Sequence, residues 1–264
     1  MKRLFIAVTL FAALLSVGAE KLRIADATNG GGDAVAGIIL QRFAVERSDV
    51  EVSLIRSNAE DALEKLEAGD FDIVLVNGGD LPPKFRARAF RYAVAAYIAC
   101  VSVKNPLRRI SVKELRMLLD APRPKWELVG GSASDIHRCG ISDRSGRLIG
   151  AGILKLGPRA RGMLMLDSMK EAILIAGGDP AALIWGPFTD GLPLAVVALE
   201  VDGVAPTRAN IRGGRYPLCV SRFAVSSAAP GKAAREFLAL LRSGEFAQLV
   251  EEDGELPELP DVRP

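Results

Sequence analysis

A regular alternation of apolar runs and helical segments over residues 21–76 places the strongest constraint on the fold of this chain. Three runs have the length and composition of buried strands, and two segments between them carry an apolar face at helical spacing. The order β-α-β-α-β is typical of a parallel sheet with helices packed on its faces. The predicted strands are residues 21–27, 50–55 and 71–76, and the predicted helices are residues 34–45 and 59–68.

Polar turns follow each of the three predicted strands. The carboxyl ends of parallel strands lie at one edge of a sheet, and ligands of such sheets bind at that edge. We therefore expect the polar side chains of these turns to face a common ligand. They are Thr28 and Asn29 after the first strand, Ser57 and Asn58 after the second, and Asn77 and Asp80 after the third.

A second polar segment, residues 135–150 (DIHRCGISDRSGRLIG), has the features of an anion-binding turn. It follows a short apolar run and leads into a predicted helix over residues 148–156. Backbone N–H groups in such a turn and the positive end of the helix dipole attract an oxyanion, and Arg138, Arg144 and Arg147 add positive charge. An exposed turn whose arginines are simply solvated is the alternative that the local sequence leaves open.

Two long strand-like runs, residues 89–103 and 216–225, separate the chain into two α/β halves. Their length predicts that they cross between two lobes and act as a hinge. We expect one lobe to comprise residues 20–98 and 217–264, and the other to comprise residues 99–216. A ligand would bind in the cleft between these lobes.

The N-terminal segment, residues 1–19, has the composition of a secretory signal peptide. Lys2 and Arg3 precede the apolar residues 4–15, and small residues lead up to Ala19. The apolar part is short for a membrane span, and an uncleaved anchor is the alternative. The segment predicts a periplasmic or secreted protein.

The chain that remains after removal of residues 1–19, and so of Lys2 and Arg3, has equal numbers of basic and acidic residues. It therefore has no overall positive charge that would attract nucleic acid.

The cysteines and the C-terminal tail give two further expectations. Three cysteines are an odd number, which does not make a disulfide framework. Cys100 and Cys219 lie in apolar runs and are predicted core residues, with a bond between them as the alternative. The Pro-rich tail that starts at Glu255 is predicted to be loose.

Three scaffold segments occur in a fixed order along the chain. They are Val103-Lys104-Asn105-Pro106 leading into SVKELRMLLDAPRPKWELVGG, then VDGVAPTRANIRGGRYPL, and finally FLALLRSGEFAQLVEEDGELP. Together they resemble the periplasmic phosphate-binding proteins of ATP-driven phosphate uptake. The resemblance implies an α/β, two-lobed type II periplasmic-binding-protein fold, in which each lobe is a mixed, mostly parallel sheet flanked by helices. It also implies a monomer that delivers phosphate or a similar oxyanion to an ABC permease, with no cofactor.

The first-lobe anion contacts of that family map onto three of the polar turns. Its first-turn hydroxyl resembles Thr28, with Asn29 adjacent, and its second-turn serine resembles Ser57. Its strand-end aspartate aligns by spacing with Asn77. A carboxylate facing the ligand accepts a proton from hydrogen phosphate and repels sulfate. An asparagine there is expected to gain a donor and to lose this discrimination.

The second-lobe contacts map onto the arginine-rich segment. The family motif, in which an arginine precedes Ser-Gly-Thr, resembles this segment because Ser145 and Gly146 are retained. Either Arg138 or Arg144 takes the guanidinium role, and Arg147 replaces the threonine. The added charge of Arg147 suits a larger or more highly charged oxyanion, whereas its bulk could also fill the site.

Catalytic interpretations of the same segment rest on few residues. His137 and Cys139 lie two residues apart, so a Cys–His dyad is a candidate, although we expect an inert thiol beside a strand-end imidazole. Ser145 lacks the G-x-S-x-G elbow of a hydrolase, and a Ser-His-Asp triad would need His137 from a neighbouring turn. A secreted hydrolase that uses Ser145 or Cys139 with His137 is therefore a minor alternative. No cysteine–histidine spacing suits zinc and no G-x-G-x-x-G is present, so we expect no enzyme, no metal and no cofactor. An exported module with a blunted pocket, used for protein contacts or another ligand, is the remaining alternative.

Overall fold

The computed structural model describes residues 20–28, 33–141, 150, 152–156, 162–252 and 255–258 of the chain. Its strands are β1 (Glu20–Ala27), β2 (Val50–Arg56), β3 (Ile73–Asn77), β4 (Ala89–Ser102), β5 (Arg109–Ile110), β6 (His137–Ile141), β7 (Leu164–Leu166), β8 (Ala182–Pro187), β9 (Val196–Ala198), β10 (Glu200–Val201), β11 (Cys219–Ser226) and β12 (Leu256–Pro257). Its α-helices are α1 (Asp33–Glu46), α2 (Ala59–Ala68), α3 (Val112–Asp120), α5 (Met169–Gly178), α6 (Arg208–Arg212), α7 (Lys232–Leu240) and α8 (Gly244–Glu252). Short 3-10 helices are η1 (Gly78–Asp80), η2 (Pro83–Arg88) and η3 (Trp126–Val129).

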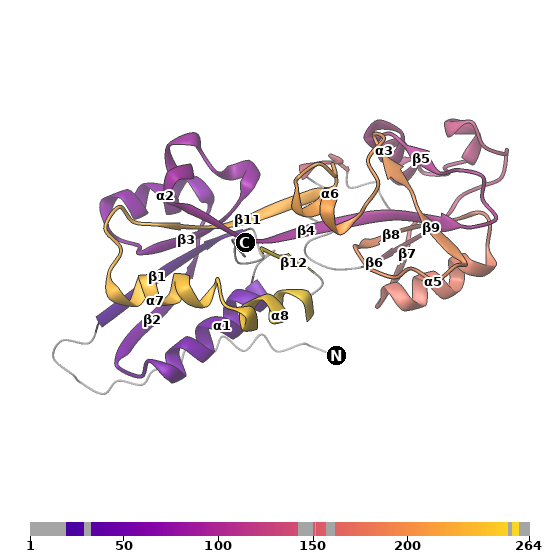
Figure 1. Cartoon of the computed structure of the whole chain (residues 1–264). Coiled ribbons are helices and arrows are strands. Elements are labelled where there is room, and N and C mark those ends of the chain that lie inside the picture. The colour runs from indigo at the N-terminus through magenta and orange to yellow at the C-terminus, as the bar shows by residue number, and fades with distance from the viewer. Residues whose placement is uncertain are drawn as a thin grey trace, which may run out of the picture.

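A mixed sheet of ten strands runs through the described part of the chain (Figure 1). Its order is β2-β1-β3-β11-β4-β8-β6-β7, with β9 and β12 paired to β4. β1 is parallel to β2 and β3, and β6 is parallel to β7 and β8. The antiparallel pairs lie in the middle, where β11 and β4 meet their neighbours. The predicted α/β fold and its opening β-α-β-α-β unit are therefore confirmed.

Strand β4 joins the two halves of the molecule. Its first half pairs with β11, and its second half pairs with β8 and β9. Figure 1 shows β4 running from the left half into the right half, with β11 beside it. We call the half that contains β1, β2 and β3 the first lobe, and the half that contains β6, β7 and β8 the second lobe. The two runs predicted to cross between the lobes, residues 89–103 and 216–225, contain β4 and β11, which pair with each other in antiparallel orientation.

Each lobe has hydrophobic packing of its own. In the first lobe, α1, α7 and α8 cover one face of the sheet, where the Phe43 and Phe237 rings meet edge to face at 5.7 Å. Helix α2 covers the other face through Leu63. In the second lobe, the largest cluster surrounds Tyr97 and Trp185, whose ring centroids are 5.0 Å apart. Separate cores are what two hinged lobes require, since each lobe must hold together when the other moves.

Helix caps fix the turns at the ends of the first-lobe strands. The Asn58 side chain accepts a hydrogen bond from the Asp61 N–H and so starts α2 directly after β2. Gly69 ends this helix with φ at 84°, a left-handed conformation that glycine adopts without strain. In the second lobe, Ser111 and Glu114 form the predicted capping box of α3.

The C-terminal tail is ordered where it was predicted to be loose. Glu255 and Leu256 are buried, and β12 pairs with the middle of β4. Arg91, on β4, also donates to the Glu258 carboxylate at 2.6 Å. The prediction was wrong for residues 255–258, because a burial partner distant in sequence outweighs the local preference of a Pro-rich stretch. The tail therefore lies across the strand that links the lobes.

The strand register excludes a bond between Cys100 and Cys219. Cys219 lies opposite Ala96, which is four residues from Cys100 along β4. At about 3.3 Å per residue the two cysteines are about 13 Å apart along the strand. A disulfide needs Cα atoms within about 7 Å. Both residues are free thiols, so the alternative of a bond between them is wrong.

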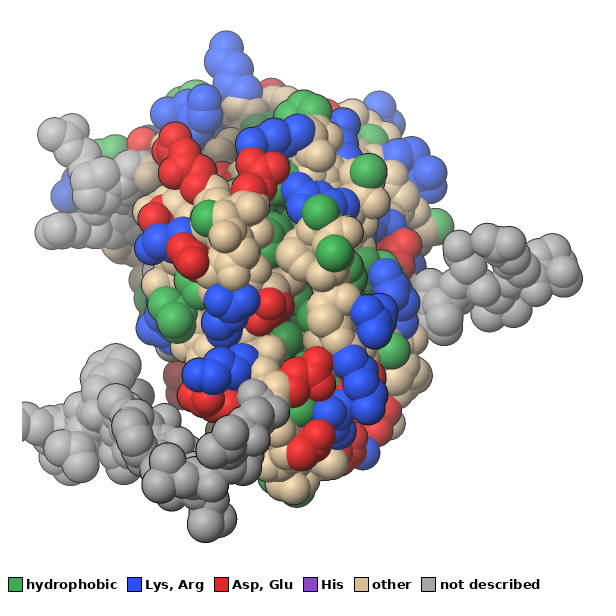
Figure 2. Space-filling view, turned by 90° about the vertical axis from the view of Figure 1, so that its left-hand side faces the viewer, with side chains coloured by type: hydrophobic (Ala, Val, Ile, Leu, Met, Phe, Trp, Pro, Cys, Tyr) green, Lys and Arg blue, Asp and Glu red, His purple; other side chains and the backbone are tan. Residues whose placement is uncertain are grey.

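The surface carries charges of both signs. Figure 2 shows Lys and Arg side chains interspersed with Asp and Glu over the outer face of the first lobe. Ion pairs such as Lys84–Glu67 at 2.7 Å connect them. No helix among the described residues is both long and apolar enough to cross a bilayer. The signal-peptide prediction for residues 1–19 lies outside the described residues. Of the helix predicted over residues 148–156, Gly150 and Gly152 are helical and residues 148, 149 and 151 lie outside the described residues. The prediction was wrong for residues 153–156, which are not helical and where Lys155 has a positive φ of 50°.

Candidate functional site

The polar turns after β1, β2 and β3 come together at one edge of the first-lobe sheet. Because the three strands are parallel, Thr28, Ser57 and Asn77 all lie at carboxyl ends. The Ser57 N–H donates to the carbonyl of Asp26 at 3.1 Å, and the Asn77 amide Nδ2 donates to the Thr28 carbonyl at 3.1 Å. The structure therefore assembles the three predicted first-lobe side chains in one place.

The Thr28 side chain is held by the carboxylate two residues before it. Its backbone N–H and its hydroxyl both donate to Oδ1 of Asp26, at 2.9 Å and 2.6 Å. Thr28 is fully buried and Asp26 is 3% exposed. Hydrogen bonds to a carboxylate are stronger than neutral ones, and shielding from water strengthens them further. Asp26 is a site residue that the sequence interpretation missed.

Ser57 has an equivalent arrangement at the start of α2. Its hydroxyl donates to Oδ2 of Asp61 at 2.8 Å. The same Asp61 oxygen accepts from Lys65 at 2.9 Å. The hydrogen bonds from Lys65 and then from Ser57 lower the pKa of the Asp61 carboxyl, so it remains an acceptor at neutral pH. Asp61 is partly exposed, whereas Asp26 is buried.

Asn77 is bound at both ends of its amide. Its Oδ1 accepts from Nη1 of Arg222 at 2.6 Å, while its Nδ2 donates to the Thr28 carbonyl. Arg222 is the register partner of Asn77 on β11 and is fully buried. One of the two hydrogens of the Asn77 amide is thus used by the β1 turn. Asn77 links two strands in addition to any contact with a ligand.

Glu255 from the C-terminal tail completes this group. Nη2 of Arg222 donates to Oε1 of Glu255 at 2.9 Å. Burial opposes the Arg222 charge, but Glu255, followed by Tyr92 and Asp26, holds its pKa above the ordinary value. Sequence reasoning missed Arg222 and Glu255. The one available signal was an arginine in the middle of the apolar run YPLCVSRFAV.

Arg138 lies on β6 and turns toward the end of α3. Its Nη1 donates to the Leu119 carbonyl at 2.6 Å, and its side chain is buried. A cation at a helix C-terminus satisfies carbonyls that have no partner within the helix. Burial lowers the Arg138 pKa, and nearby Asp120 opposes that effect. The described contacts of Arg138 are therefore those of a residue that stabilises the second lobe.

The other second-lobe candidates lie outside the described residues. These are Arg144, Ser145, Gly146 and Arg147, and the first-lobe candidate Asn29 lies outside them as well. The described geometry is thus that of the first-lobe half of the site, made by Thr28, Ser57 and Asn77.

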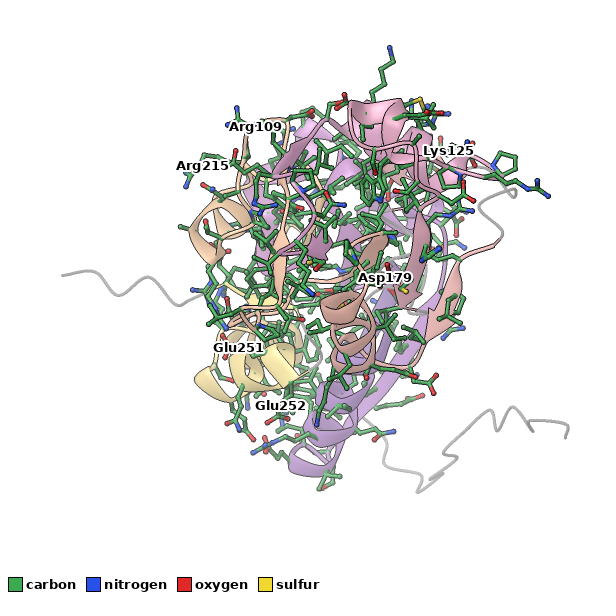
Figure 3. The ribbon with its side chains drawn as sticks, turned by 90° about the vertical axis from the view of Figure 1, so that its right-hand side faces the viewer. Arg109, Lys125, Asp179, Arg215, Glu251 and Glu252 are labelled. Atoms are coloured by element: carbon green, nitrogen blue, oxygen red, sulfur yellow. The ribbon has the colours of Figure 1, made fainter. Side chains whose placement is uncertain are left out.

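His137 and Cys139 do not form a dyad with each other in the described structure. His137 Nδ1 is 2.6 Å from Oδ2 of Asp179, at the end of α5 (Figure 3). The His137 side chain is largely exposed, whereas Cys139 is buried. Burial, followed by the charge of Asp179, raises the pKa of the Cys139 thiol. A protonated buried thiol is a poor nucleophile.

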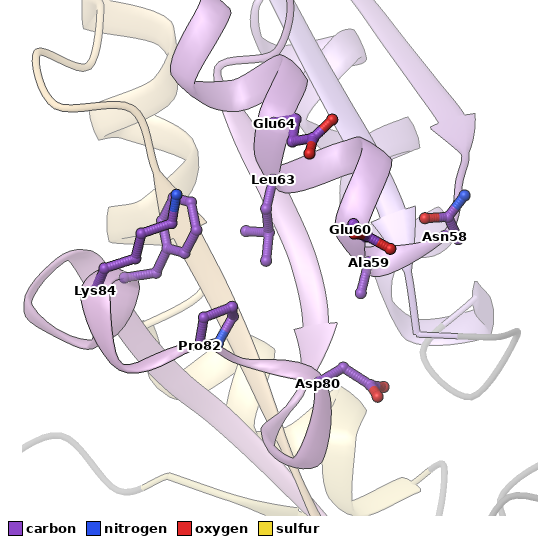
Figure 4. Close-up of a pocket in the computed structure, with 9 residues that line it drawn as sticks. Asn58, Ala59, Glu60, Leu63, Glu64, Asp80, Pro82 and Lys84 are labelled. Atoms are coloured by element: carbon purple, nitrogen blue, oxygen red, sulfur yellow. The ribbon is translucent and has the colours of Figure 1, made fainter.

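A groove of about 580 Å³ opens beside the first-lobe turns (Figure 4). Leu63 and Phe85 contribute apolar surface, and Glu60, Glu64 and Asp80 contribute carboxylates. Lys84, the one cation among the lining residues, is paired with a carboxylate outside the groove. The carboxylates would repel an anion, so this groove is not a second oxyanion site. Figure 4 shows Asp80 and Glu60 on opposite sides of the space.

Comparisons with known proteins bear on this architecture. The family model described as a PBP superfamily domain matches residues 19–245. The phosphate-binding protein PstS of Bacillus subtilis is 23% identical over 244 residues, which cover 87% of this chain and 80% of that protein. The crystal structure of PstS from Borrelia burgdorferi superposes with a TM-score of 0.70 at 16% identity, covering 90% of this chain and 98% of the other. An ABC-type phosphate transport receptor from Vibrio cholerae has a TM-score of 0.69 at 15% identity, covering 90% and 99%.

Proposed function

The chain belongs to the PBP superfamily. From that premise we propose that it is an exported solute-binding protein that captures an oxyanion, with phosphate as the preferred candidate ligand. The observation that carries the proposal is the meeting of Thr28, Ser57 and Asn77 at one edge of the first-lobe sheet. The relative from Bacillus subtilis is a phosphate-binding protein, which supports phosphate as the ligand. The proposed ligand-binding residues are Thr28, Asn29, Ser57 and Asn77 from the first lobe and Arg144, Ser145, Gly146 and Arg147 from the second.

The proposed binding mechanism is closure of two lobes on the ligand. An anion binds first to one lobe, and rotation about β4 and β11 brings the second lobe onto it. Fixed hydroxyl and N–H groups then replace the hydration shell of the anion, and each charge-assisted bond contributes about 1.5–3 kcal/mol.

Delivery to an ABC permease is the proposed role in transport. The similarity in fold to an ABC-type phosphate transport receptor supports it. Export through the segment 1–19 would place the protein where such a receptor works. We propose that it has no enzymatic activity, since the buried, protonated Cys139 thiol offers His137 no activated nucleophile.

Ligand titration tests the proposed function directly. Protein lacking residues 1–19 is titrated calorimetrically with phosphate, arsenate and sulfate, and its melting temperature is followed in parallel. A ligand at a hundred times its dissociation constant adds about 2.7 kcal/mol to the free energy of unfolding. Saturable binding of phosphate with a rise in melting temperature is expected. No response to any oxyanion would contradict the proposal and favour a module that contacts another ligand or a protein.

A further inference from the structure

Residues 103–129 form a corner of the second lobe that is rich in cations, and we call it the basic corner. It contains β5, α3 and η3, and η3 lies next to α3. The segment has three acids and seven cations. The cations are Lys104, Arg108, Arg109, Lys113, Arg116, Arg123 and Lys125. Because the chain without residues 1–19 has equal numbers of basic and acidic residues, the rest of it carries an excess of acids. Positive charge is therefore concentrated in this corner.

The seven cations are exposed and available to a partner. None of them forms an ion pair with another described residue. First-lobe cations such as Arg23 and Lys84 are instead paired with carboxylates, at 3.0 Å and 2.7 Å. The Arg108 guanidinium donates to the backbone carbonyls of Leu107 and Val103, which do not neutralise its charge.

Several acids around the basic corner are used within the protein. Glu114 accepts from the N–H of its own helix cap at 2.8 Å, and Asp202 accepts from the Val112 N–H at 3.0 Å. The charge of Asp120 acts on the buried Arg138. The other acids near the corner are Glu127, Asp135 and Glu200. The seven cations outnumber these three, so the corner remains positive.

Helix α3 carries cations and an apolar side chain on the same face. Its buried residues are Leu115, Leu118 and Leu119. Lys113, Arg116 and Met117 are separated by three and four positions, so they lie together on the opposite face. Met117 is 39% exposed, and Leu128 on η3 is 45% exposed. The basic corner thus offers apolar side chains between its positive charges.

The basic corner is separate from the proposed ligand site. In Figure 1, α3 and β5 lie at the upper end of the second lobe, away from β1, β2 and β3. Figure 3 shows Arg109 and Lys125 along the upper edge of the molecule. Glu251 and Glu252, at the end of α8, lie toward the lower edge in the same view. The corner contains none of the proposed ligand-binding residues, so it can be occupied independently of the cleft.

We propose that the basic corner is a docking surface for an anionic membrane. Its cations contact lipid phosphates, while Met117 and Leu128 enter the boundary between headgroups and acyl chains. The affinity of a surface for a bilayer rises with buried apolar area and with attraction to anionic lipids. A hydrophilic polyanion would use the charges alone and would leave the apolar side chains in water. The proposal does not depend on which ligand the cleft binds.

Vesicles of two compositions provide the first measurement. Protein lacking residues 1–19 is used, because that apolar segment would itself bind lipid. It is sedimented with vesicles of phosphatidylcholine alone and of phosphatidylcholine mixed with phosphatidylglycerol. Binding to the mixed vesicles should be at least about tenfold stronger and should weaken as salt is added. Equal binding to both would overturn the proposal. No binding to either would also overturn it and leave an acidic protein as the partner of this face.

A double substitution on α3 assigns the binding to this face. Each cation near an anionic surface raises the affinity about fivefold, so Lys113→Gln/Arg116→Gln should weaken vesicle binding about twenty- to thirtyfold. The matched control is Lys232→Gln/Arg235→Gln, which removes two exposed cations at the same spacing from α7 of the first lobe. The control should bind as the unaltered protein does. Equal losses in the two variants would show that only the net charge matters and would overturn the proposal.

Fluorescence at position 117 tests the contact with lipid. The two native tryptophans, Trp126 and Trp185, are buried, so a change in the emission of Met117→Trp reports on the new side chain. Its emission should shift to shorter wavelength when mixed vesicles are added, because the indole leaves water. Vesicle binding without this shift would place α3 away from the lipid and overturn the proposal. The double variants should keep the phosphate affinity and melting temperature of the unaltered protein, which separates this surface from the proposed function.

Discussion

Arg222 lies directly opposite Asn77 in the antiparallel pairing of β11 with β3, and its Nη1 atom donates to the Asn77 Oδ1 at 2.6 Å. The same guanidinium is paired with Glu255 at 2.9 Å. One buried cation therefore connects a candidate ligand residue, a strand shared by the two lobes and the C-terminal tail. This connection explains why residues 255–258, the described part of the Pro-rich tail, pack against β4.

Removal of the Arg222 guanidinium should destabilise the protein strongly. Arg222→Met leaves the buried Glu255 carboxylate without this cation, and breaking a buried pair from one side costs about 3–5 kcal/mol. Urea unfolding followed by circular dichroism measures the loss. Equal stability of the variant and the unaltered protein would show that the pair does not hold the tail.

The double variant Arg222→Met/Glu255→Met separates the charge from the packing. Replacing both partners of a buried ion pair by apolar side chains is often neutral, so most of the lost stability should return. The double variant should also unfold at a higher urea concentration than the single one. If both variants were equally unstable, the loss would come from packing around residue 222 and not from the uncompensated carboxylate.

The local parts of this fold follow from the sequence, whereas the contacts between distant segments do not. The β-α-β-α-β order and the capping box at Ser111 depend on residues within a few positions of each other. The Arg222–Asn77 contact spans 145 positions, and nothing near Arg222 in the sequence indicates its partner. The loose-tail prediction failed for the same reason, because only the folded β4 provides the partner of Leu256.

The candidate site was predictable to a similar extent. The position of Thr28, Ser57 and Asn77 at one edge of the sheet was predictable, because polar residues after parallel strands must share that edge. Their internal hydrogen bonds to Asp26, Asp61 and the Thr28 carbonyl were not foreseen, because the direction of a hydroxyl or an amide depends on the neighbours that folding supplies.

The three thiols should be protected from modification in the folded protein. Burial raises the pKa of Cys100 to about 12 and also raises the pKa values of Cys139 and Cys219. Because the thiolate is the reactive form, a thiol reagent at neutral pH should react at least about tenfold more slowly with folded than with urea-unfolded protein. Mass spectrometry identifies the labelled residue. Fast labelling of Cys139 in the folded state would reopen the case for a nucleophile beside His137.

The contact between His137 and Asp179 should contribute stability that acid removes. Burial opposes the Asp179 charge, but the hydrogen bonds from His137 and from the Ala181 N–H lower its pKa below the ordinary value of 3.8. A carboxyl with a lowered pKa stabilises the folded state above its ordinary pKa and loses that contribution as the pH falls below it. Asp179→Asn should therefore cost less than about 1 kcal/mol at neutral pH, given the partial exposure of the pair.

The pH dependence of this variant is the decisive measurement. The stability difference between Asp179→Asn and the unaltered protein should shrink as the pH falls below 3.8 and through the lowered pKa of the native carboxyl, which then becomes protonated as well. A difference that stays constant from neutral to acid pH would show that the hydrogen bond to the Ala181 N–H, and not the charge, carries the effect.

Of two substitutions in the arginine-rich segment, Arg138→Met should lower the stability of the protein and Ser145→Glu should abolish phosphate binding. Arg138→Met removes the donor to the Leu119 carbonyl at the end of α3, so it should lower the free energy of unfolding by about 1–3 kcal/mol.

Ser145→Glu introduces a carboxylate where the proposed site receives an anion, so it should abolish phosphate binding by repulsion and leave the melting temperature unchanged. Calorimetry and thermal unfolding of both variants provide the comparison. Unchanged phosphate affinity in Ser145→Glu would remove this segment from the site, and lost affinity in a folded Arg138→Met would assign the guanidinium role to Arg138.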